Sequence, residues 1–133
     1  MIGIVLVSHG EIASAFKKAV EHVVGAQEQF HTICIDADDD MERRRSDIVA
    51  AIETVDTGKG VVVVTDMFGG TPSNLAISLM EPGRVEIIAG MNLPMLIKLA
   101  KVRENKEMGV VLSCASEAGK KYINVASQVL AGK

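Results

Sequence analysis

The sequence has few aromatic residues and few cysteines. Of its 133 residues only 3% are aromatic, none is tryptophan, and the two cysteines are Cys34 and Cys114. The cysteines lie far apart and fit neither a disulfide framework nor a zinc-binding spacing, so we expect two buried thiols in a reducing cytoplasm. Because 48% of the residues are hydrophobic, the core must be built from aliphatic side chains and methionine.

Long apolar runs and an excess of basic residues are also missing. No run approaches the roughly 18 residues of a membrane span. The apolar start has no basic region before it and breaks at Ser8-His9-Gly10, so we predict a strand there and not a signal peptide. The net charge is −3. Without a basic stripe or an aromatic platform, nucleic acid is not an expected partner. We expect one cytoplasmic domain over residues 1–133.

Strand and helix signals alternate along most of the chain. Apolar runs predict buried strands at Ile2–Val7, Phe30–Ile35, Val61–Thr65 and Val85–Ala89. Helical periodicity predicts helices at Ile12–Val24, Met41–Val55, Ser73–Met80 and from Gly90 to Val102. Successive units of this kind predict a three-layer α/β/α fold, in which helices cover both faces of a mainly parallel, doubly wound sheet.

The last third of the chain is less regular. Val110-Val111-Leu112 fits a strand or part of a helix, because periodicity does not separate short apolar runs. Tyr122–Leu130 alternates weakly between apolar and polar residues, as an edge strand would.

Two side chains that can carry chemistry follow buried strands. His9 comes after the first strand and Asp66 after the third, so both should lie at the carboxyl edge of the sheet, where such folds bind ligands. A carboxylate that accepts a hydrogen bond from one ring nitrogen fixes the histidine tautomer. The other nitrogen is then free to act as a nucleophile or a base. His9 and Asp66 are therefore the candidate catalytic residues.

The segment after Asp66 has the composition of a phosphate-binding turn. Gly69 and Gly70 allow close backbone approach, the N–H groups at the start of the following helix attract anions, and Thr71 and Ser73 add hydroxyl donors. A nucleophilic histidine, an orienting aspartate and a phosphate cradle together indicate phosphoryl transfer through a phosphohistidine. We expect neither a cofactor nor a metal ion.

Other interpretations of these residues are weaker. His9 alone would more often be structural, but Asp66 and the glycine turn at the same edge favour chemistry. A receiver domain also places a phosphoacceptor aspartate after its third strand, but it needs an acidic pair where this chain has Ser8-His9. The acidic run Asp36–Asp40 lacks the glycine and glutamate of an EF-hand and fits a solvated, helix-capping loop. Glu11 would repel phosphate, so we expect it to face solvent or a partner.

Three segments resemble, in the same order, the enzyme IIA domain of the mannose family of the phosphoenolpyruvate-dependent sugar phosphotransferase system. They are residues 4–10 (IVLVSHG), 63–74 (VVTDMFGGTPSN) and 85–96 (VEIIAGMNLPML). The resemblance extends over nearly the whole chain. The related phosphotransferase subunit of dihydroxyacetone kinase has Ser-His-Ser at the first of these motifs, where this chain has Ser8-His9-Gly10.

The resemblance implies that His9 accepts a phosphoryl group from phospho-HPr and passes it to an enzyme IIB domain. Asp66 would bond Nδ1, leaving Nε2 to attack. The resemblance also implies a helix at Met108–Lys120, and a homodimer in which Tyr122–Leu130 is exchanged as an antiparallel edge strand.

The role of such a phosphocarrier stays open at this point. In sugar uptake it would need a separate IIB and, indirectly, a membrane permease, because we expect no room for a IIB domain before the chain ends at Lys133. Alternatively, phosphorylation would be a regulatory signal that changes which partner is bound. A third hypothesis, a non-catalytic binding module, predicts no phosphoryl uptake.

Overall fold

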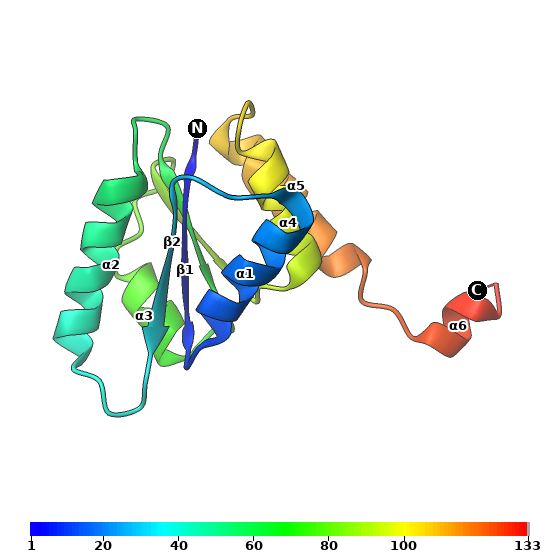
Figure 1. Cartoon of the computed structure of the whole chain (residues 1–133), viewed down its shortest axis with the longest axis horizontal. Coiled ribbons are helices and arrows are strands. Elements are labelled where there is room, and N and C mark those ends of the chain that lie inside the picture. Colours follow the sequence, from blue (N-terminus) through cyan, green and yellow to red (C-terminus); the bar gives the residue numbers. More distant parts are fainter. Residues whose placement is uncertain (133) are drawn as a thin grey trace.

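The computed structural model describes residues 1–132, and its body has three layers (Figure 1). The middle layer is a parallel sheet in the order β2-β1-β3-β4. The strands are β1 (Gly3–His9), β2 (Phe30–Ile35), β3 (Val61–Thr65) and β4 (Val85–Ala89). One face is covered by α1 (Ile12–Val24), α4 (Leu93–Val102) and α5 (Met108–Lys121), the other by α2 (Met41–Val55) and α3 (Thr71–Ile77). The predicted three-layer fold is confirmed.

The strands are apolar throughout because both faces of the sheet are buried. In β1, Ile4 and Leu6 pack toward α1, α4 and α5, whereas Val5 and Val7 pack toward α2 and α3. All four side chains are fully buried. Burying one such side chain stabilises the fold by roughly 1.5–3 kcal/mol relative to leaving it exposed, so the sheet needs no aromatic residues to form a core.

Two element boundaries near the carboxyl edge differ from the predictions. β1 continues to His9, because Ser8 and His9 pair with β2. α3 begins at Thr71, two residues earlier than predicted, because Gly70 is its extended N-cap residue and Pro72 occupies its first turn. His9 is therefore the last residue of a strand, and the glycine turn leads directly into α3.

Arg103 holds the opposite, amino edge of the sheet together. It is 1% exposed, and its guanidinium donates hydrogen bonds to the carbonyls of Ile2 at 3.1 Å, Gln29 at 3.0 Å and Glu28 at 2.6 Å. Burial lowers the pKa of this guanidinium, although the carboxylates of nearby glutamates partly oppose the shift. Arg103 thus ties the end of α4 to the start of the sheet.

The C-terminal segment differs from the predicted edge strand. α5 is helical, which decides the ambiguity at 110–112 and confirms the helix at Met108–Lys120. Beyond it, α6 (Ala126–Leu130) is a short helix that projects from the body (Figure 1). The prediction of a strand at Tyr122–Leu130 is wrong for the single chain. A strand needs the backbone groups of a neighbouring strand, and this segment, which leaves the body, forms the local backbone bonds of α6.

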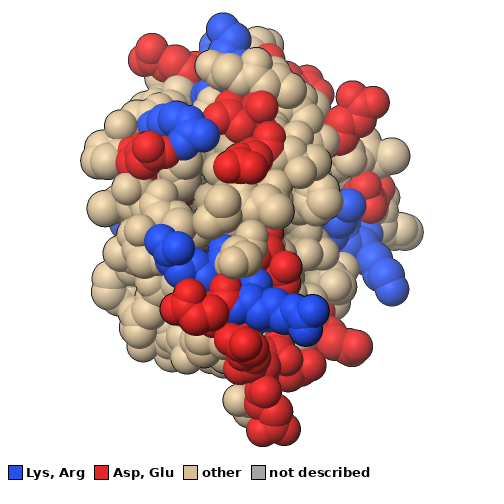
Figure 2. Space-filling view, turned by 90° about the vertical axis from the view of Figure 1, so that its left-hand side faces the viewer, with Lys and Arg blue, Asp and Glu red and all other residues tan. Residues whose placement is uncertain are grey.

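The surface over α2 carries charges of both signs. Figure 2 shows lysine, arginine, aspartate and glutamate side chains interleaved on this face. Arg44, for example, lies 3.3 Å from Asp47 and 3.9 Å from Asp39. Within residues 1–132, no helix has the length and apolar content that crossing a bilayer demands.

Candidate functional site

The strand order places the site where the chain connections diverge. From β1 the chain crosses by α1 to β2 on one side, whereas from β3 it crosses by α3 to β4 on the other. In open α/β sheets the crevice between two such strands, at their carboxyl ends, is the usual ligand site. His9 ends β1 and Asp66 directly follows β3, so both predicted residues lie there.

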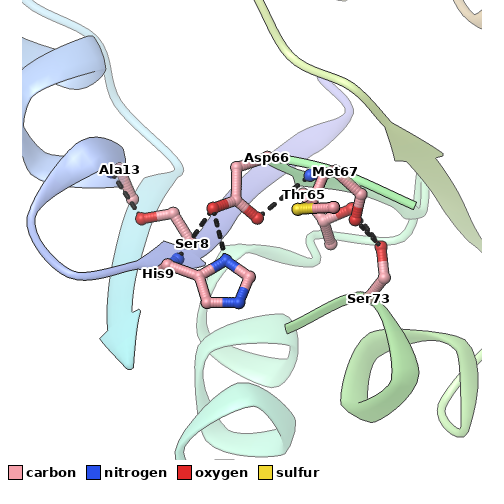
Figure 3. A network of polar contacts seen from close by, with 7 residues as sticks. All are labelled: Ser8, His9, Ala13, Thr65, Asp66, Met67 and Ser73. Carbon is pink, nitrogen blue, oxygen red and sulfur yellow. Dashed lines mark hydrogen bonds and ion pairs between the residues drawn. The ribbon is translucent and has the colours of Figure 1, made fainter. Parts of the chain in front are cut away.

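One carboxylate oxygen of Asp66 holds His9 at two points (Figure 3). Oδ2 accepts the backbone N–H of His9 at 2.9 Å and lies 2.8 Å from the ring nitrogen Nδ1. An ionised carboxylate can only accept hydrogen bonds, so Nδ1 carries the proton and Nε2 of the neutral ring is left with a lone pair. The bond to the backbone was not predicted. It fixes the backbone from which the ring extends, whereas the Nδ1 contact fixes the tautomer.

The electrostatics of the pair keep Asp66 ionised. Its side chain is 10% exposed, whereas that of His9 is 48% exposed. Burial by itself would raise the pKa of Asp66. The hydrogen bonds from the His9 backbone and ring, together with the positive charge of the imidazole in its protonated form, outweigh that effect and hold the pKa of Asp66 below its ordinary value. Asp66 is therefore a fixed negative charge beside the imidazole near neutral pH.

The free edge of the His9 ring lies against Gly70. A Cβ placed on Gly70 would be 2.8 Å from Cε1 and 3.3 Å from Nε2 of His9. Nε2 points away from Asp66 (Figure 3), so the glycine turn and the predicted nucleophilic atom are neighbours. The neighbouring Gly69 has a φ of +90°, a conformation that favours glycine.

The hydroxyl of Ser73 is not available as the predicted phosphate donor. Ser73 is fully buried; its Oγ donates to the carbonyl of Met67 at 2.7 Å and lies 2.6 Å from the hydroxyl of Thr65 (Figure 3). Sequence alone could not show this direction, because the third residue of a helix can face either solvent or the preceding loop. Thr71, by contrast, is exposed at the start of α3.

Ser8 is a structural residue of the site that sequence reasoning missed. It is fully buried, and its Oγ accepts the N–H of Ala13 at 2.7 Å. It thereby caps α1 in place of the N-cap residue Glu11, which makes no capping bond and is exposed as predicted. The signal that could have revealed it was a serine, a residue type that caps helices, four residues before the start of α1.

The site is an open rim and not an enclosed pocket. Beside His9, the side chains of Met67 and Phe68 are 54% and 76% exposed. A hollow of about 630 Å³ lies at the opposite end of the sheet, near Met1 and Arg103, too far away to serve His9. Among residues 1–132, no three histidine, cysteine, aspartate or glutamate side chains gather as a metal site would require. Both cysteines are free and half-buried, less enclosed than predicted.

Residues 3–116 match the EIIA-man family, described as the PTS system fructose IIA component. The chain belongs to this family. It is 35% identical over 111 residues to the sorbose-specific EIIA component of Lacticaseibacillus casei, covering 83% of this chain and 80% of that protein. It is 30% identical over 124 residues to the mannose-specific EIIAB component of Escherichia coli K12, covering 92% of this chain but only 38% of that protein.

Solved structures share the fold of this EIIA chain. The phosphotransferase system component EIIA from Streptococcus agalactiae aligns with a TM-score of 0.86 over 96% of this chain and 99% of its own, at 23% identity. The mannose/sorbose-specific IIA subunit from Enterococcus faecalis aligns with a TM-score of 0.82 over 93% of each chain, also at 23% identity. The family resemblance deduced from the three motifs is confirmed.

Proposed function

We propose that this EIIA chain is a histidine phosphocarrier that accepts a phosphoryl group on Nε2 of His9 from phospho-HPr and passes it to an enzyme IIB domain. The contact of 2.8 Å between Nδ1 and Asp66 is the observation that carries the proposal. It fixes the tautomer in which Nε2 has a lone pair, on a ring that is 48% exposed and so accessible to another protein.

The transfer step needs no change in the number of protons on His9. The Nε2 lone pair forms a bond to phosphorus in line with the bond that breaks, and the electron pair of that P–N bond returns to the donor's imidazole. The His9 ring, with Nδ1 still protonated, becomes cationic, and the Asp66 carboxylate stabilises it. Phosphoryl transfer passes through a loose transition state, so this positioning and electrostatic support are what the protein supplies. The donor phospho-HPr and the product phospho-His9 are both phosphoramidates of similar energy, so the step is reversible and His9 can pass the phosphoryl group on to IIB.

The transferred phosphoryl oxygens would be held by the glycine turn. Nε2 lies at the backbone of Gly70, and the first N–H groups of a helix have no intrahelical acceptor, so those near Gly69, Gly70 and Thr71 can serve the anion. Thr71 adds an exposed hydroxyl. The Ser73 hydroxyl is left out of this cradle, because it already donates to Met67.

Two exposed apolar surfaces support the proposal that this chain binds other proteins. Met67 and Phe68 stand on the rim beside His9, where HPr and IIB would dock in turn. The C-terminal segment exposes Ile123, Val129 and Leu130, which are 76%, 51% and 86% exposed. We assign this second surface to a homodimer, because a second copy of the chain would bury these apolar side chains and so stabilise the segment.

Sugar uptake is favoured over a purely regulatory role by the relatives, whose names specify sorbose and mannose components. A regulatory role would use the same chemistry, and the sugar itself never contacts His9 in this scheme. The two roles differ in the partner, because uptake requires transfer onward to a IIB domain.

Labelled phosphoenolpyruvate, enzyme I and HPr test the proposal directly. The chain should acquire label that is acid-labile and alkali-stable, and the label should be absent in His9→Ala. His22→Ala, which removes an exposed histidine of α1, should be labelled as well as the wild type. Addition of a IIB domain should then remove the label. Label that persists in His9→Ala would overturn the assignment.

A further inference from the structure

A chain of three polar groups connects the end of β3 to the loop that follows Asp66. Thr65 and Ser73 are both fully buried. Their hydroxyl oxygens are 2.6 Å apart, and the Ser73 hydroxyl lies 2.7 Å from the carbonyl oxygen of Met67. Figure 3 shows this chain on the far side of Asp66 from the His9 ring.

The direction of the hydrogen bonds follows from counting protons. A carbonyl oxygen can only accept, so the single hydroxyl proton of Ser73 goes to Met67. The Thr65 hydroxyl must then donate to Ser73. Each bond in such a chain polarises the next, which strengthens the bond that ends on the Met67 carbonyl.

Met67 links this chain to the carboxylate. Its backbone N–H donates to Oδ1 of Asp66 at 3.0 Å, while Oδ2 holds His9. The peptide groups around Met67 are therefore fixed on both sides, by the carboxylate at the N–H and by Ser73 at the carbonyl. A rotation of this loop would turn the carboxylate plane and move Oδ2 away from Nδ1.

We propose that Thr65 and Ser73 are positioning residues for the phosphocarrier chemistry: their hydroxyl pair clamps the Met67 backbone and so fixes the carboxylate plane of Asp66 and the tautomer of His9. This inference rests on the proposed function for its kinetic consequence. Its structural consequence, the orientation of Asp66 on His9, exists in the unphosphorylated chain and can be measured without any donor.

A merely structural role for the pair would have a different outcome. Loss of a buried hydroxyl lowers stability wherever it occurs. Ser78 provides the control on the same helix, since its Oγ also donates to a backbone carbonyl, that of Leu75 at 2.6 Å, but it is exposed and lies at the opposite end of α3. Removal of the buried Ser73 hydroxyl should destabilise the chain more than removal of the exposed Ser78 hydroxyl, and only Ser73→Ala should alter His9.

The test compares Ser73→Ala, Thr65→Val, Thr65→Ser and Ser78→Ala, each at a temperature at which thermal melts show it folded. The first readout is the ¹⁵N chemical shifts of the His9 ring nitrogens in the unphosphorylated protein. Wild type and Ser78→Ala should show a protonated Nδ1 and an unprotonated Nε2. Ser73→Ala should show both shifts averaged toward a mixture of tautomers.

The second readout is the rate of phosphoryl uptake at saturating phospho-HPr. Ser73→Ala should lower it by about threefold to thirtyfold, the range between a lost hydrogen bond and a small misplacement of the reacting group. Thr65→Val, which keeps the bond from Ser73 to Met67, should have a smaller effect, and Thr65→Ser should restore most of the rate. The proposal would be overturned if Ser73→Ala and Thr65→Val both had the same ¹⁵N shifts of the His9 ring and the same uptake rate as Ser78→Ala.

The two hypotheses fail in different ways. A wild-type chain that takes up no phosphoryl group would overturn the proposed function. The nitrogen shifts would still decide the role of the hydroxyl pair. Should Ser73→Ala not fold, the isosteric Thr65→Val decides through the same shifts, with a partial change supporting the proposal and unchanged shifts contradicting it.

Discussion

Gly70 lies against the Cε1–Nε2 edge of the His9 ring so closely that a methyl group on it would be 2.8 Å from Cε1. The φ of Gly70 is −90°, which any residue can adopt, so close approach and not backbone conformation requires glycine here. The ring can move away from an added methyl group because half of it is exposed. Such a movement would separate Nδ1 from Asp66.

Gly70→Ala should therefore slow phosphoryl uptake strongly while changing stability little. We expect a loss of about tenfold to a hundredfold, on the scale of a reacting group displaced by roughly 1 Å. Gly109→Ala is the control, because a Cβ at Gly109 meets no atom within 4 Å. Quenched-flow uptake and thermal melts of both variants check this, and a wild-type rate in Gly70→Ala would show that the ring does not need this approach.

Asp66→Asn should slow uptake by roughly tenfold to a thousandfold, the scale for loss of an electrostatic partner in the transition state. The amide oxygen can still accept from His9, but it offers no charge to the cationic ring. Asp47→Asn removes an exposed carboxylate that pairs with Arg44 and should transfer at the wild-type rate. If Asp66→Asn does the same, Asp66 has no part in the mechanism.

The contribution of Asp66 to stability should depend on pH in the acid range. Its folded pKa is lowered, so the folded state favours the carboxylate more than the unfolded state does. The added stability is fully present above the unfolded pKa of about 3.9 and is lost as pH falls through the folded value. The difference in the free energy of unfolding between wild type and Asp66→Asn should be constant near neutral pH and change in favour of Asp66→Asn below about pH 4. Urea titrations from pH 7 to pH 3 measure it; a difference independent of pH would contradict the lowered pKa.

The strands, His9 and Asp66 were predictable because each depends on short-range pattern plus one rule of topology. Buried parallel strands are continuous apolar runs, and their carboxyl ends share one edge of the sheet. The proximity of His9 and Asp66, which are 57 positions apart, could therefore be predicted. The direction of the Ser73 hydroxyl was not predictable. It depends on how α3 packs on the end of β3, and a helix shifted by two residues turns that side chain from solvent toward Met67.

The segment Tyr122–Leu130 differs in the single chain from the predicted strand for another reason, while its exchange in a homodimer stays a prediction. Alternation of apolar and polar residues indicates a strand only where another strand is there to pair with it, and β-structure is more dependent on context than helix. Within one chain the segment leaves the body, so it forms the local bonds of α6. Its apolar side chains, not its secondary structure, are the informative feature.

Phe68→Ala should weaken the docking of protein donors and leave the chemistry of His9 intact. An exposed aromatic side chain at the centre of a transient interface contributes about 1–2 kcal/mol, so the KM for phospho-HPr should rise by about fivefold to thirtyfold. Phosphorylation by phosphoramidate, a small donor with the same P–N bond, should be unchanged. Met80→Ala, which removes another exposed apolar side chain, should alter neither. An equal loss with both donors would mean that Phe68 acts on His9 and not on the partner.

The C-terminal segment should determine the oligomeric state. Leu130 is 86% exposed in the single chain, and burying a leucine contributes about 1.5–3 kcal/mol, counted twice in a symmetric dimer. Leu130→Asp combined with Ile123→Asp should therefore convert the proposed homodimer to a monomer in sedimentation velocity at micromolar concentration. Val23→Asp provides the control, since Val23 is an exposed valine of α1, 54% exposed, and should leave the dimer intact. If the double variant and the wild type sediment alike, the dimer contact lies elsewhere.

Labelling of His9 in the monomeric variant then shows whether phosphoryl uptake needs the second copy. Because His9 and Asp66 come from one chain, we expect uptake to persist.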